Sequence, residues 1–525
     1  MRITQLGFFN ANRKEFDCLF TIQSKGKVEV TLEEIESRII RHNNAPLLTA
    51  HQQYIQKDIV PFDVPGHKRG RGNRYLQDLF GEETMKLDVN SLPELDQLSH
   101  PTGVIKEAQA LMADAYGADE AFFMVNGTSS SVHAMILSTC KPGDKILLPR
   151  NVHKSAINAL ILSGAVPIYM DVEIDEQLGI ATTVSDQVVM EAIFANRDAK
   201  AILLLNPSYW GFCSNLQKII ACAKKQDILV LVDEAHGAHF PFHSKLPKSA
   251  ITFGADLVAT SVHKTGGALT QSSVLLANKG NIDLQYVGMV INMIQSTSAS
   301  YLLMSSLDGA RKNLVLHGKA IFDELLPLIQ QTKQEINEIP GLSTYGQELI
   351  GSNGIYDVDE TKIGIHVSKL GLTGFEVYEI LRIEYQIQLE LGDAYNVLAI
   401  VSLGDDDRSL KSLVEALVDL SKKYYKHNTI FNRRFFPKLQ PQVVMNPREA
   451  FYASKETVSL NQAIGRISGE SIMAYPPGIP ILSPGELITE ESIEYITFLK
   501  KQHANLTDAL DKNVETLTVI KQGVW

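Results

Sequence analysis

The stretch ILVLVDEA, residues 228–235, joins a short, unbroken apolar run to two carboxylates, Asp233 and Glu234. A run that is apolar at every position and rich in Val and Leu is typical of a strand covered on both faces, because a half-exposed strand alternates apolar and polar residues. Such strands belong to parallel sheets, which bind ligands at the carboxyl ends of their strands. The stretch therefore predicts a parallel sheet with Asp233 at its ligand-binding edge.

Similar runs occur before and after this stretch, separated by amphipathic segments such as LQKIIACAKKQ (216–226). The runs are AFFMV (121–125), DKILLP (144–149), VPIYMDV (166–172), AILLLNPS (201–208), DLVATSV (256–262) and SSVLLAN (272–278). Short apolar runs that alternate with helices predict an α/β fold, with a central, mostly parallel sheet sandwiched by helices. Asn126, Asn206, Asp233 and Lys264 fall where runs end, so we expect them along one edge of this sheet.

The pattern changes along the chain, from loop-rich segments at the start to longer helical spacing after residue 300. The predicted division is an N-terminal extension of unclear role at 1–44, an N-terminal arm at 45–115, a large α/β domain at 116–300, a small α+β domain at 301–430 and a C-terminal domain at 431–525.

The composition bounds the possible partners. The chain has 525 residues, of which 45% are hydrophobic, so it is long enough to form more than one domain. Its 49 Lys and Arg against 60 Asp and Glu give a formal charge of −11, which disfavours a nucleic-acid track or an anionic membrane surface. Small molecules and other protein chains are the expected partners.

Cysteine usage and the N-terminus point to a reducing compartment. Four cysteines at irregular spacing support neither a disulfide framework nor a metal site. The first residues lack the basic start and apolar run of a signal peptide, and no apolar stretch approaches the length of a membrane span. We expect a cytoplasmic protein without a bound metal.

The stretch ATSVHKTGGALTQSS, residues 259–273, places Lys264 at the end of an apolar run among small and hydroxylic residues. A lysine with a buried stem and a solvated amine would fit this position, and so would a reactive lysine. The DEAH of 233–236, taken alone, also fits the magnesium-binding box of a helicase. The chain contains neither the GxxxxGK[ST] loop of that class nor a GxGxxG dinucleotide loop, so helicases and nicotinamide enzymes are both disfavoured.

A strand-end aspartate and a strand-end lysine are the pair that pyridoxal 5'-phosphate (PLP) chemistry requires. The lysine amine forms a Schiff base with the cofactor, and the carboxylate keeps the pyridine nitrogen protonated. The turn NGTSSS (126–131) supplies hydroxyls and free N–H groups for the phosphate where it opens a helix. The same turn would also suit an ordinary helix cap.

A set of motifs in a fixed order carries a resemblance to a known family. The motifs are FDVPGHKRG (62–70), NGTSSS (126–131), RNVHKSAINAL (150–160), NPSYWG (206–211), VLVDEAHGAH (230–239), TSVHKTGGALTQSS (260–273), STSASYLL (296–303) and AYPPGIPILSPGE (474–486). In this order they resemble the Orn/Lys/Arg decarboxylases of PLP fold type I, and most closely the short, biosynthetic arginine decarboxylases of Gram-positive bacteria. The resemblance covers about residues 45 to 515, and residues 1–44 have no counterpart in it.

The resemblance implies a role for each matched residue. Lys264 is similar to the family's Schiff-base lysine, Asp233 to the partner of the pyridine nitrogen, and His153 to the histidine that stacks on the ring and helps to protonate Cα. The expected cofactor-phosphate ligands are Gly127, Thr128, Ser129, Ser261 and His263. A buried packing histidine is the competing interpretation for His263, and a surface-loop histidine for His153.

Two further residues have less specific expectations. His236 is expected near the ring oxygen of the cofactor or near Lys264, and a purely packing role fits it nearly as well. Glu486, in the PGE of the last motif, is a candidate for the distal cation of the substrate, because a guanidinium or ammonium requires a carboxylate. An ordinary surface glutamate is the alternative.

The implied reaction is decarboxylation of a basic amino acid, with arginine, which gives agmatine for polyamine synthesis, as the first choice and lysine or ornithine as the alternatives. Transamination or β-elimination on the same fold, and a non-catalytic regulator, remain open from the residues alone. The resemblance also implies a homodimer or a higher homo-oligomer, in which residues 296–298 of one subunit approach the phosphate of its neighbour. A simple helix N-cap fits Ser296, Thr297 and Ser298 equally well.

Overall fold

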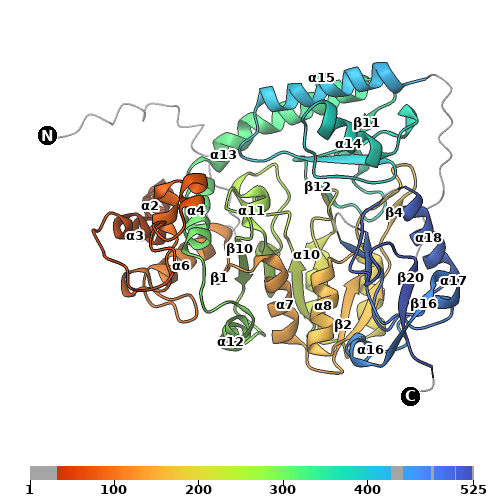
Figure 1. The fold of residues 1–525 in the computed structure, drawn as a ribbon, viewed down its shortest axis with the longest axis horizontal. Coiled ribbons are helices and arrows are strands. Elements are labelled where there is room, and N and C mark those ends of the chain that lie inside the picture. The colour runs from red at the N-terminus through yellow and green to blue at the C-terminus, as the bar shows by residue number, and fades with distance from the viewer. Residues whose placement is uncertain (1–31, 427–441, 475–477, 503, 523–525) are drawn as a thin grey trace.

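The computed structural model describes residues 32–426, 442–474, 478–502 and 504–522, and a seven-stranded sheet forms its centre (Figure 1). The strands, in spatial order, are β1 (Glu120–Met124), β10 (Ser273–Ala277), β9 (Leu257–Thr260), β8 (Leu229–Asp233), β6 (Ala201–Leu205), β2 (Lys145–Pro149) and β3 (Val166–Met170). Only β10 runs antiparallel to its neighbours in this sheet, and the other pairs are parallel. The predicted mostly parallel sheet is confirmed, and each predicted run contains one of its strands.

Apolar side chains on both faces of the sheet explain why its strands are unbroken apolar runs. In β8, Val230 and Val232 pack into one core, while Leu229 and Leu231 pack into another. The first core is covered by α6 (Val104–Tyr116), α9 (Asp186–Ala195) and α10 (Leu216–Lys224), and the second by α7 (Gly127–Thr139), α8 (Lys154–Ser163) and α12 (Leu284–Ile294). Helices therefore cover both faces, as a parallel sheet requires.

Smaller α+β units complete the described part of the chain. A four-stranded sheet of β11 (Ser343–Thr344), β13 (Lys362–His366), β15 (Asn396–Ile400) and β14 (Leu391–Gly392) packs against α13 (Tyr301–Glu338), α14 (Gly374–Glu384) and α15 (Asp407–Tyr424). Toward the C-terminus, β16 (Lys455–Ser459) pairs with β20 (Thr516–Ile520), and β18 (Ile479–Leu482), β17 (Ile472–Ala474) and β19 (Leu506–Thr507) form a sheet near α18 (Glu490–Lys501). Among the described residues, no helix has the length and apolarity to cross a membrane.

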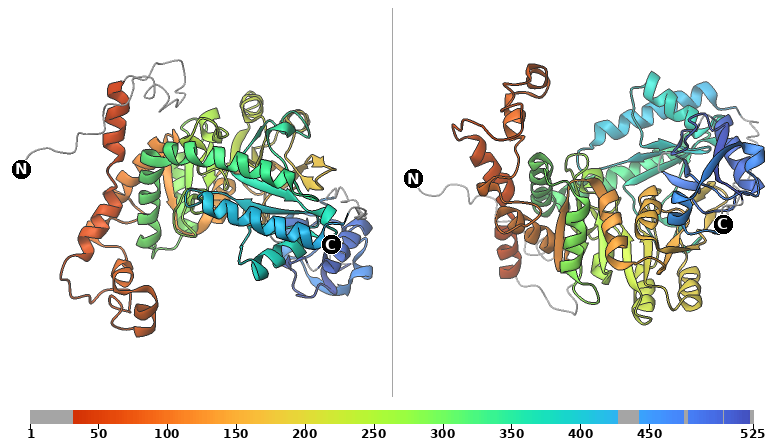
Figure 2. Two further views of the ribbon diagram at one scale, coloured as in Figure 1. Left: turned by 90° about the horizontal axis from the view of Figure 1, so that it is seen from above. Right: turned by 60° about the horizontal axis from the view of Figure 1, so that its bottom comes forward.

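The N-terminal segment stands away from this body. Its helices are α2 (Leu32–His42), α3 (Pro46–Ile55), α4 (Arg74–Phe80) and α5 (Glu82–Leu87). Figure 2 shows them projecting from the side of the molecule at which α13 begins. Residues 1–31, which include most of the extension expected at 1–44, lie outside the described residues.

A buried ion pair ties this segment to the long helix α13. The N-cap of α3, Ala45, has no side-chain acceptor, so the first N–H groups of that helix need a partner from elsewhere. Asp308 of α13 accepts hydrogen bonds from the N–H groups of Leu47 (3.0 Å) and Leu48 (3.3 Å). Its other carboxylate oxygen accepts from Nη2 of Arg311 (2.8 Å), and both charged side chains are fully buried.

We expect Asp308→Ala to lower the free energy of unfolding by about 3–5 kcal/mol, because it leaves the Arg311 guanidinium buried without its counter-charge. Denaturant unfolding followed by circular dichroism measures this loss. Glu324→Ala is the matched control, since Glu324 lies on the same helix with an exposed side chain and should cost at most about 1 kcal/mol. Equal losses in the two variants would contradict the role given to Asp308.

Candidate active site

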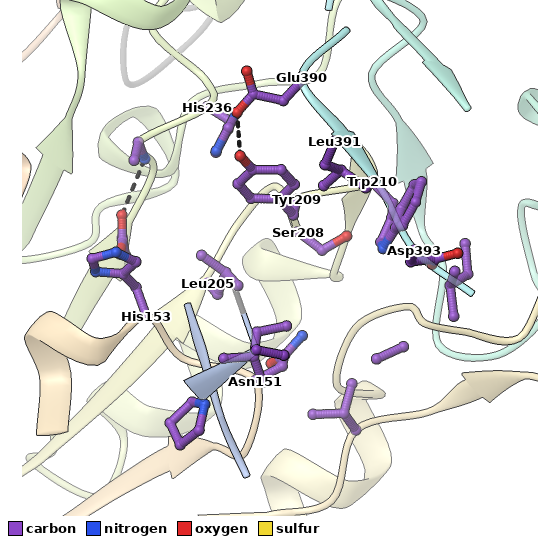
Figure 3. Close-up of a pocket in the computed structure, with 18 of the residues that line it drawn as sticks. Asn151, His153, Leu205, Ser208, Tyr209, Trp210, His236, Glu390, Leu391 and Asp393 are labelled. Atoms are coloured by element: carbon purple, nitrogen blue, oxygen red, sulfur yellow. Dashed lines mark hydrogen bonds between the residues drawn. The ribbon is translucent and has the colours of Figure 1, made fainter. Parts of the chain in front are cut away.

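The carboxyl ends of the central strands open into a cavity of about 670 Å³ (Figure 3). Its lining includes Thr128 after β1, Ser208 after β6, Asp233 at the end of β8 and Lys264 after β9. These segments meet because parallel strands bring their carboxyl ends to the same edge. Every site residue named from the sequence lines this cavity except Glu486.

Lys264 lies on the short helix α11 (Val262–Thr265), which directly follows β9. Its Nζ is 2.9 Å from Nε2 of His236 and 5.8 Å from the centre of the Tyr209 ring. Burial lowers the pKa of this amine, and the negative charges of Asp233 and Glu390 only partly oppose the effect. The position therefore favours an uncharged, nucleophilic amine.

Asp233 is the last residue of β8, and its side chain is buried. One carboxylate oxygen accepts a hydrogen bond from the N–H of Ala235 at 3.1 Å. Burial raises the pKa of the carboxyl group, whereas Lys264 acts in the opposite direction. A cationic group beside Asp233 in the cavity would lower the pKa of its carboxyl group and so stabilise the ionised carboxylate.

The start of α7 offers an anion-binding site. Gly127 has a φ of +74°, a backbone conformation that favours glycine. The space beside it is open, because an added Cβ would meet no atom within 4 Å. The N-cap residue of this helix, Asn126, makes no side-chain cap bond, and the N–H of Gly127 donates to the carbonyl oxygen of Gln271 at 3.1 Å, so an anion would be bound by the N–H groups that follow Gly127. Ser129 is exposed toward the cavity, and Thr128 is buried.

Hydroxyl groups and a histidine from other strands extend this anion-binding site. The hydroxyl of Thr128 is hydrogen-bonded to the hydroxyls of Ser261 and of Ser273, the latter at 2.7 Å. His263 donates from Nδ1 to the carbonyl oxygen of Ser272 at 2.9 Å, and burial lowers its pKa. Neutral His263 consequently presents an acceptor at Nε2, and it binds an anion only in its protonated form.

His153 precedes α8 and caps that helix. Its Nδ1 accepts a hydrogen bond from the N–H of Ser155 at 3.2 Å and lies 2.9 Å from the Ser155 hydroxyl. Burial lowers the pKa of the imidazole to about 4, with a further contribution from the charge of Lys264. At neutral pH the ring is therefore uncharged and carries its proton on Nε2.

Sequence reasoning did not find three residues of the site: Tyr209, Lys362 and Glu390. The Tyr209 hydroxyl donates to Glu390, and the Tyr209 ring packs edge-on against His236, with ring centres 4.5 Å apart (Figure 3). The Nζ of Lys362 is 3.1 Å from Nδ1 of His236. Tyr209 lies within the NPSYWG motif, which could have signalled it. Lys362 and Glu390 come from the unit built around the four-stranded sheet, which we call the smaller unit. No motif marks them there.

The interpretation of Glu486 as a receptor for a substrate cation does not fit the structure. Its side chain is 2% exposed, and its two oxygens accept hydrogen bonds from Nη1 (2.5 Å) and Nη2 (2.9 Å) of Arg150. The N–H of Ser483 donates to the same carboxylate at 3.0 Å. The charge of Glu486 is therefore already balanced by a cation of this chain, and the PGE motif ties the C-terminal segment to the loop after β2.

We expect Glu486→Gln to lower the free energy of unfolding by about 2–5 kcal/mol, because the guanidinium of Arg150 loses a bidentate, buried counter-charge. Chemical denaturation measures the loss. The control is Glu515→Gln, since Glu515 pairs with Lys500 in the same segment but is 72% exposed, so at most about 1 kcal/mol is expected there. A loss no larger than that of the control would show that Arg150 does not depend on Glu486.

A second prediction concerns the pH dependence of stability. Between about pH 6.5 and pH 4, the unfolded chain takes up a proton at His153 while the folded chain does not, so stability falls as the pH falls. We expect His153→Asn, which keeps a capping side chain without a titratable ring, to reduce this slope by as much as about 1 kcal/mol per pH unit. Urea titrations at a series of pH values test this, with His317→Asn on the exposed face of α13 as the control. Identical slopes in the wild type and His153→Asn would contradict a buried, neutral His153.

The fold and the cavity define the class of protein. A mostly parallel seven-stranded sheet, with a lysine and an aspartate at its carboxyl edge, is the arrangement of PLP enzymes of fold type I. Sequence models of the Orn/Lys/Arg decarboxylase family match the chain over residues 45–409 for the major domain and 429–507 for the C-terminal domain. The chain belongs to the Orn/Lys/Arg decarboxylase family.

Individual relatives agree with this assignment. The chain is 43% identical to an arginine decarboxylase of Bacillus anthracis over 91% of this chain and 97% of the relative. It is 44% identical to the arginine decarboxylase of Bacillus subtilis over 86% and 93% of the two chains. Among solved structures, the lysine decarboxylase LdcF of Francisella novicida is similar in fold, with a TM-score of 0.79, 21% identity, and coverage of 94% of this chain and 84% of that one.

Proposed function

We propose that this protein decarboxylates arginine to agmatine and CO2 with PLP bound in the cavity at the carboxyl edge of the central sheet, in the cytoplasm. The observation that carries the proposal is the identity of 43–44% with arginine decarboxylases along most of both chains. The constitutive lysine decarboxylase of Escherichia coli is only 24% identical to this chain. Arginine is therefore preferred over lysine as the substrate.

The residues of the cavity fit PLP. The Lys264 amine faces His236 and, among the residues that the structure describes, makes no ion pair at hydrogen-bond distance, so it is available to hold the cofactor covalently. Asp233 would hold a proton on the pyridine nitrogen, and that positive charge would in turn stabilise the buried carboxylate. The uncapped start of α7, with Thr128 and Ser129, and the hydroxyl of Ser261 would bind the phosphate.

PLP supplies a protonated ring that accepts the electron pair left behind when the carboxylate departs as CO2. Side chains of the cavity supply the charges and the protons that the loss of CO2 requires. We propose that His153 protonates Cα after CO2 has left; it does so as the imidazolium, which donates the proton on Nε2 and returns to the neutral ring, and its low pKa makes that imidazolium a strong acid. Apolar side chains of the lining, such as Leu205 and Ile481, reduce access of water to the reacting centre.

With Glu486 committed to Arg150, the guanidinium of arginine needs other acceptors. Asp171, Glu390 and Asp393 line the cavity in addition to Asp233. Burial raises the pKa of Asp393 to about 6, so this group is mostly ionised at neutral pH but remains sensitive to an approaching cation. We propose that the distal cation lies among these three carboxylates.

We also propose that the chain works at least as a homodimer, with an arm at 45–115, a large domain at 116–300, and smaller units at 301–430 and 431–525. The arm carries several large apolar side chains that are well exposed in the single chain, namely Phe62, Tyr75 and Leu79. Residues 296–298 are exposed as well. An apolar, projecting segment of this kind supports contact with a second copy of the chain.

The experiment that tests the function is product identification. PLP-loaded protein is incubated separately with arginine, lysine and ornithine, and CO2 and amine are both quantified. We expect equal amounts of agmatine and CO2 from arginine, and a loss of about 10³-fold or more in Lys264→Ala, because the group that holds the cofactor is removed. Cadaverine or putrescine as the main product would change the substrate and keep the reaction. A keto acid in place of an amine would replace decarboxylation with transamination.

A further inference from the structure

His236 lies between two lysines at the floor of the cavity. Its Nε2 is 2.9 Å from Nζ of Lys264, and its Nδ1 is 3.1 Å from Nζ of Lys362. The imidazole is buried, and desolvation lowers its pKa well below the usual value. The ring is therefore neutral, with one N–H and one lone pair.

This arrangement restricts the charges of the lysines. An ammonium can only donate hydrogen bonds, and a neutral imidazole can accept only at the nitrogen that carries no proton. Two ammonium groups on the two ring nitrogens would place one donor against another. While both contacts are made, at most one lysine can consequently be an ammonium that donates to the ring, and the other must be an uncharged amine that accepts from it.

The proposed function requires Lys362 to be the charged partner, because Lys264 has to be an uncharged amine before it can hold the cofactor. It opens β13 and is 1% exposed, and its charge is favoured by Asp359 and Glu390, although burial lowers its pKa to about 8. Asp359 remains ionised, with a pKa of about 2 that reflects His239 and Lys362 despite its burial. Around Lys362, Asp359 thus comes from its own turn, His239 from the segment after β8 and Glu390 from the segment before β14.

The stem of Lys362 packs closely on the backbone of Gly211. Gly211 has a φ of +94°, and a Cβ added there would lie 2.8 Å from Cγ of Lys362 and 3.1 Å from the carbonyl oxygen of Asp359. The lysine stem therefore occupies the space that a side chain at residue 211 would need. Its amine lies 3.1 Å from Nδ1 of His236, and the ring of Tyr209 packs edge-on against the same imidazole.

We propose that Lys362 is a positioning residue: its ammonium donates to Nδ1 of His236, fixes the imidazole proton on Nε2, and so directs an N–H at the lone pair of Lys264. The inference rests on the proposed function, in which Lys264 must be an uncharged amine before it can hold the cofactor. Lys362 reaches that amine from the smaller unit through one histidine, without contacting the substrate or the cofactor itself.

The reactivity of Lys264 in cofactor-free protein tests this proposal without relying on activity. Brief labelling with acetic anhydride over a pH series acetylates only the uncharged amine, and peptide mass spectrometry reports Lys264 separately from the other lysines. We expect Lys362→Met to raise the pH midpoint of Lys264 labelling by at least about one unit, which is a roughly tenfold lower labelling rate at neutral pH. Lys362→Arg retains a permanent donor and should restore most of the shift.

Two further variants separate this role from a general effect on the fold. Lys333→Met is the matched control, because Lys333 is also a buried lysine of the smaller unit but pairs with Glu360 at 2.6 Å, away from His236. We expect no shift in that variant. His236→Leu should raise the midpoint as Lys362→Met does, and the double variant should shift no further than either single change. If Lys362→Met does not fold, His236→Leu alone decides.

The outcomes that overturn the proposal are specific. They are a shift below about 0.3 units in Lys362→Met, an equal shift in Lys333→Met, an undiminished effect of Lys362→Met in the His236→Leu background, or no shift in His236→Leu. The proposed function fails in a different way. In that case the wild type labels as expected but acquires no visible absorbance from lysine-bound PLP and releases no amine from arginine.

Discussion

Burial of one amine, that of Lys264, is the constraint on which the site depends. Burial at the end of β9 favours the uncharged form of Lys264. Removing this amine from water costs free energy, which the stability of the surrounding fold has to offset. The parallel sheet meets that requirement. Its core on both faces holds the carboxyl ends of β8 and β9 next to each other, so that His236, three residues after the end of β8, lies within hydrogen-bond distance of the amine.

Much of the fold and of the cofactor side of the site could be predicted from the sequence, because both follow from local patterns. Unbroken apolar runs indicated each strand of the central sheet, and the residue that ends a run is placed at the sheet edge by topology alone. Lys264, Asp233, His153 and Thr128 were found in this way or through motifs, and all of them line the cavity. The chemistry common to the family is thus encoded near the strand ends.

The remainder depends on contacts between residues that are distant in the sequence. Lys362 meets His236 from a strand of another sheet, 126 positions along the chain, and nothing in its local sequence distinguishes it from a surface lysine. The interpretation of Glu486 as a receptor for the substrate cation does not fit the structure for the same reason. A carboxylate in a Gly-Pro motif gives no sign of Arg150, which lies 336 positions earlier and balances its charge. Pairing of buried charges is a property of the packed chain, and sequence patterns do not report it.

The charged residues around the cavity fall into two groups that come from different parts of the fold. Lys264, Asp233 and the start of α7 come from the large sheet and would hold the cofactor in the proposed function, whereas Lys362, Glu390 and Asp393 come from the unit around the four-stranded sheet. If Lys264 is uncharged, Lys362 is the remaining ammonium at His236, and the carboxylates of the lining outnumber it. Such a cavity attracts a substrate with a second positive charge and disfavours one with a second carboxylate. The preference for basic amino acids therefore follows from the same buried-charge balance that keeps the Lys264 amine reactive.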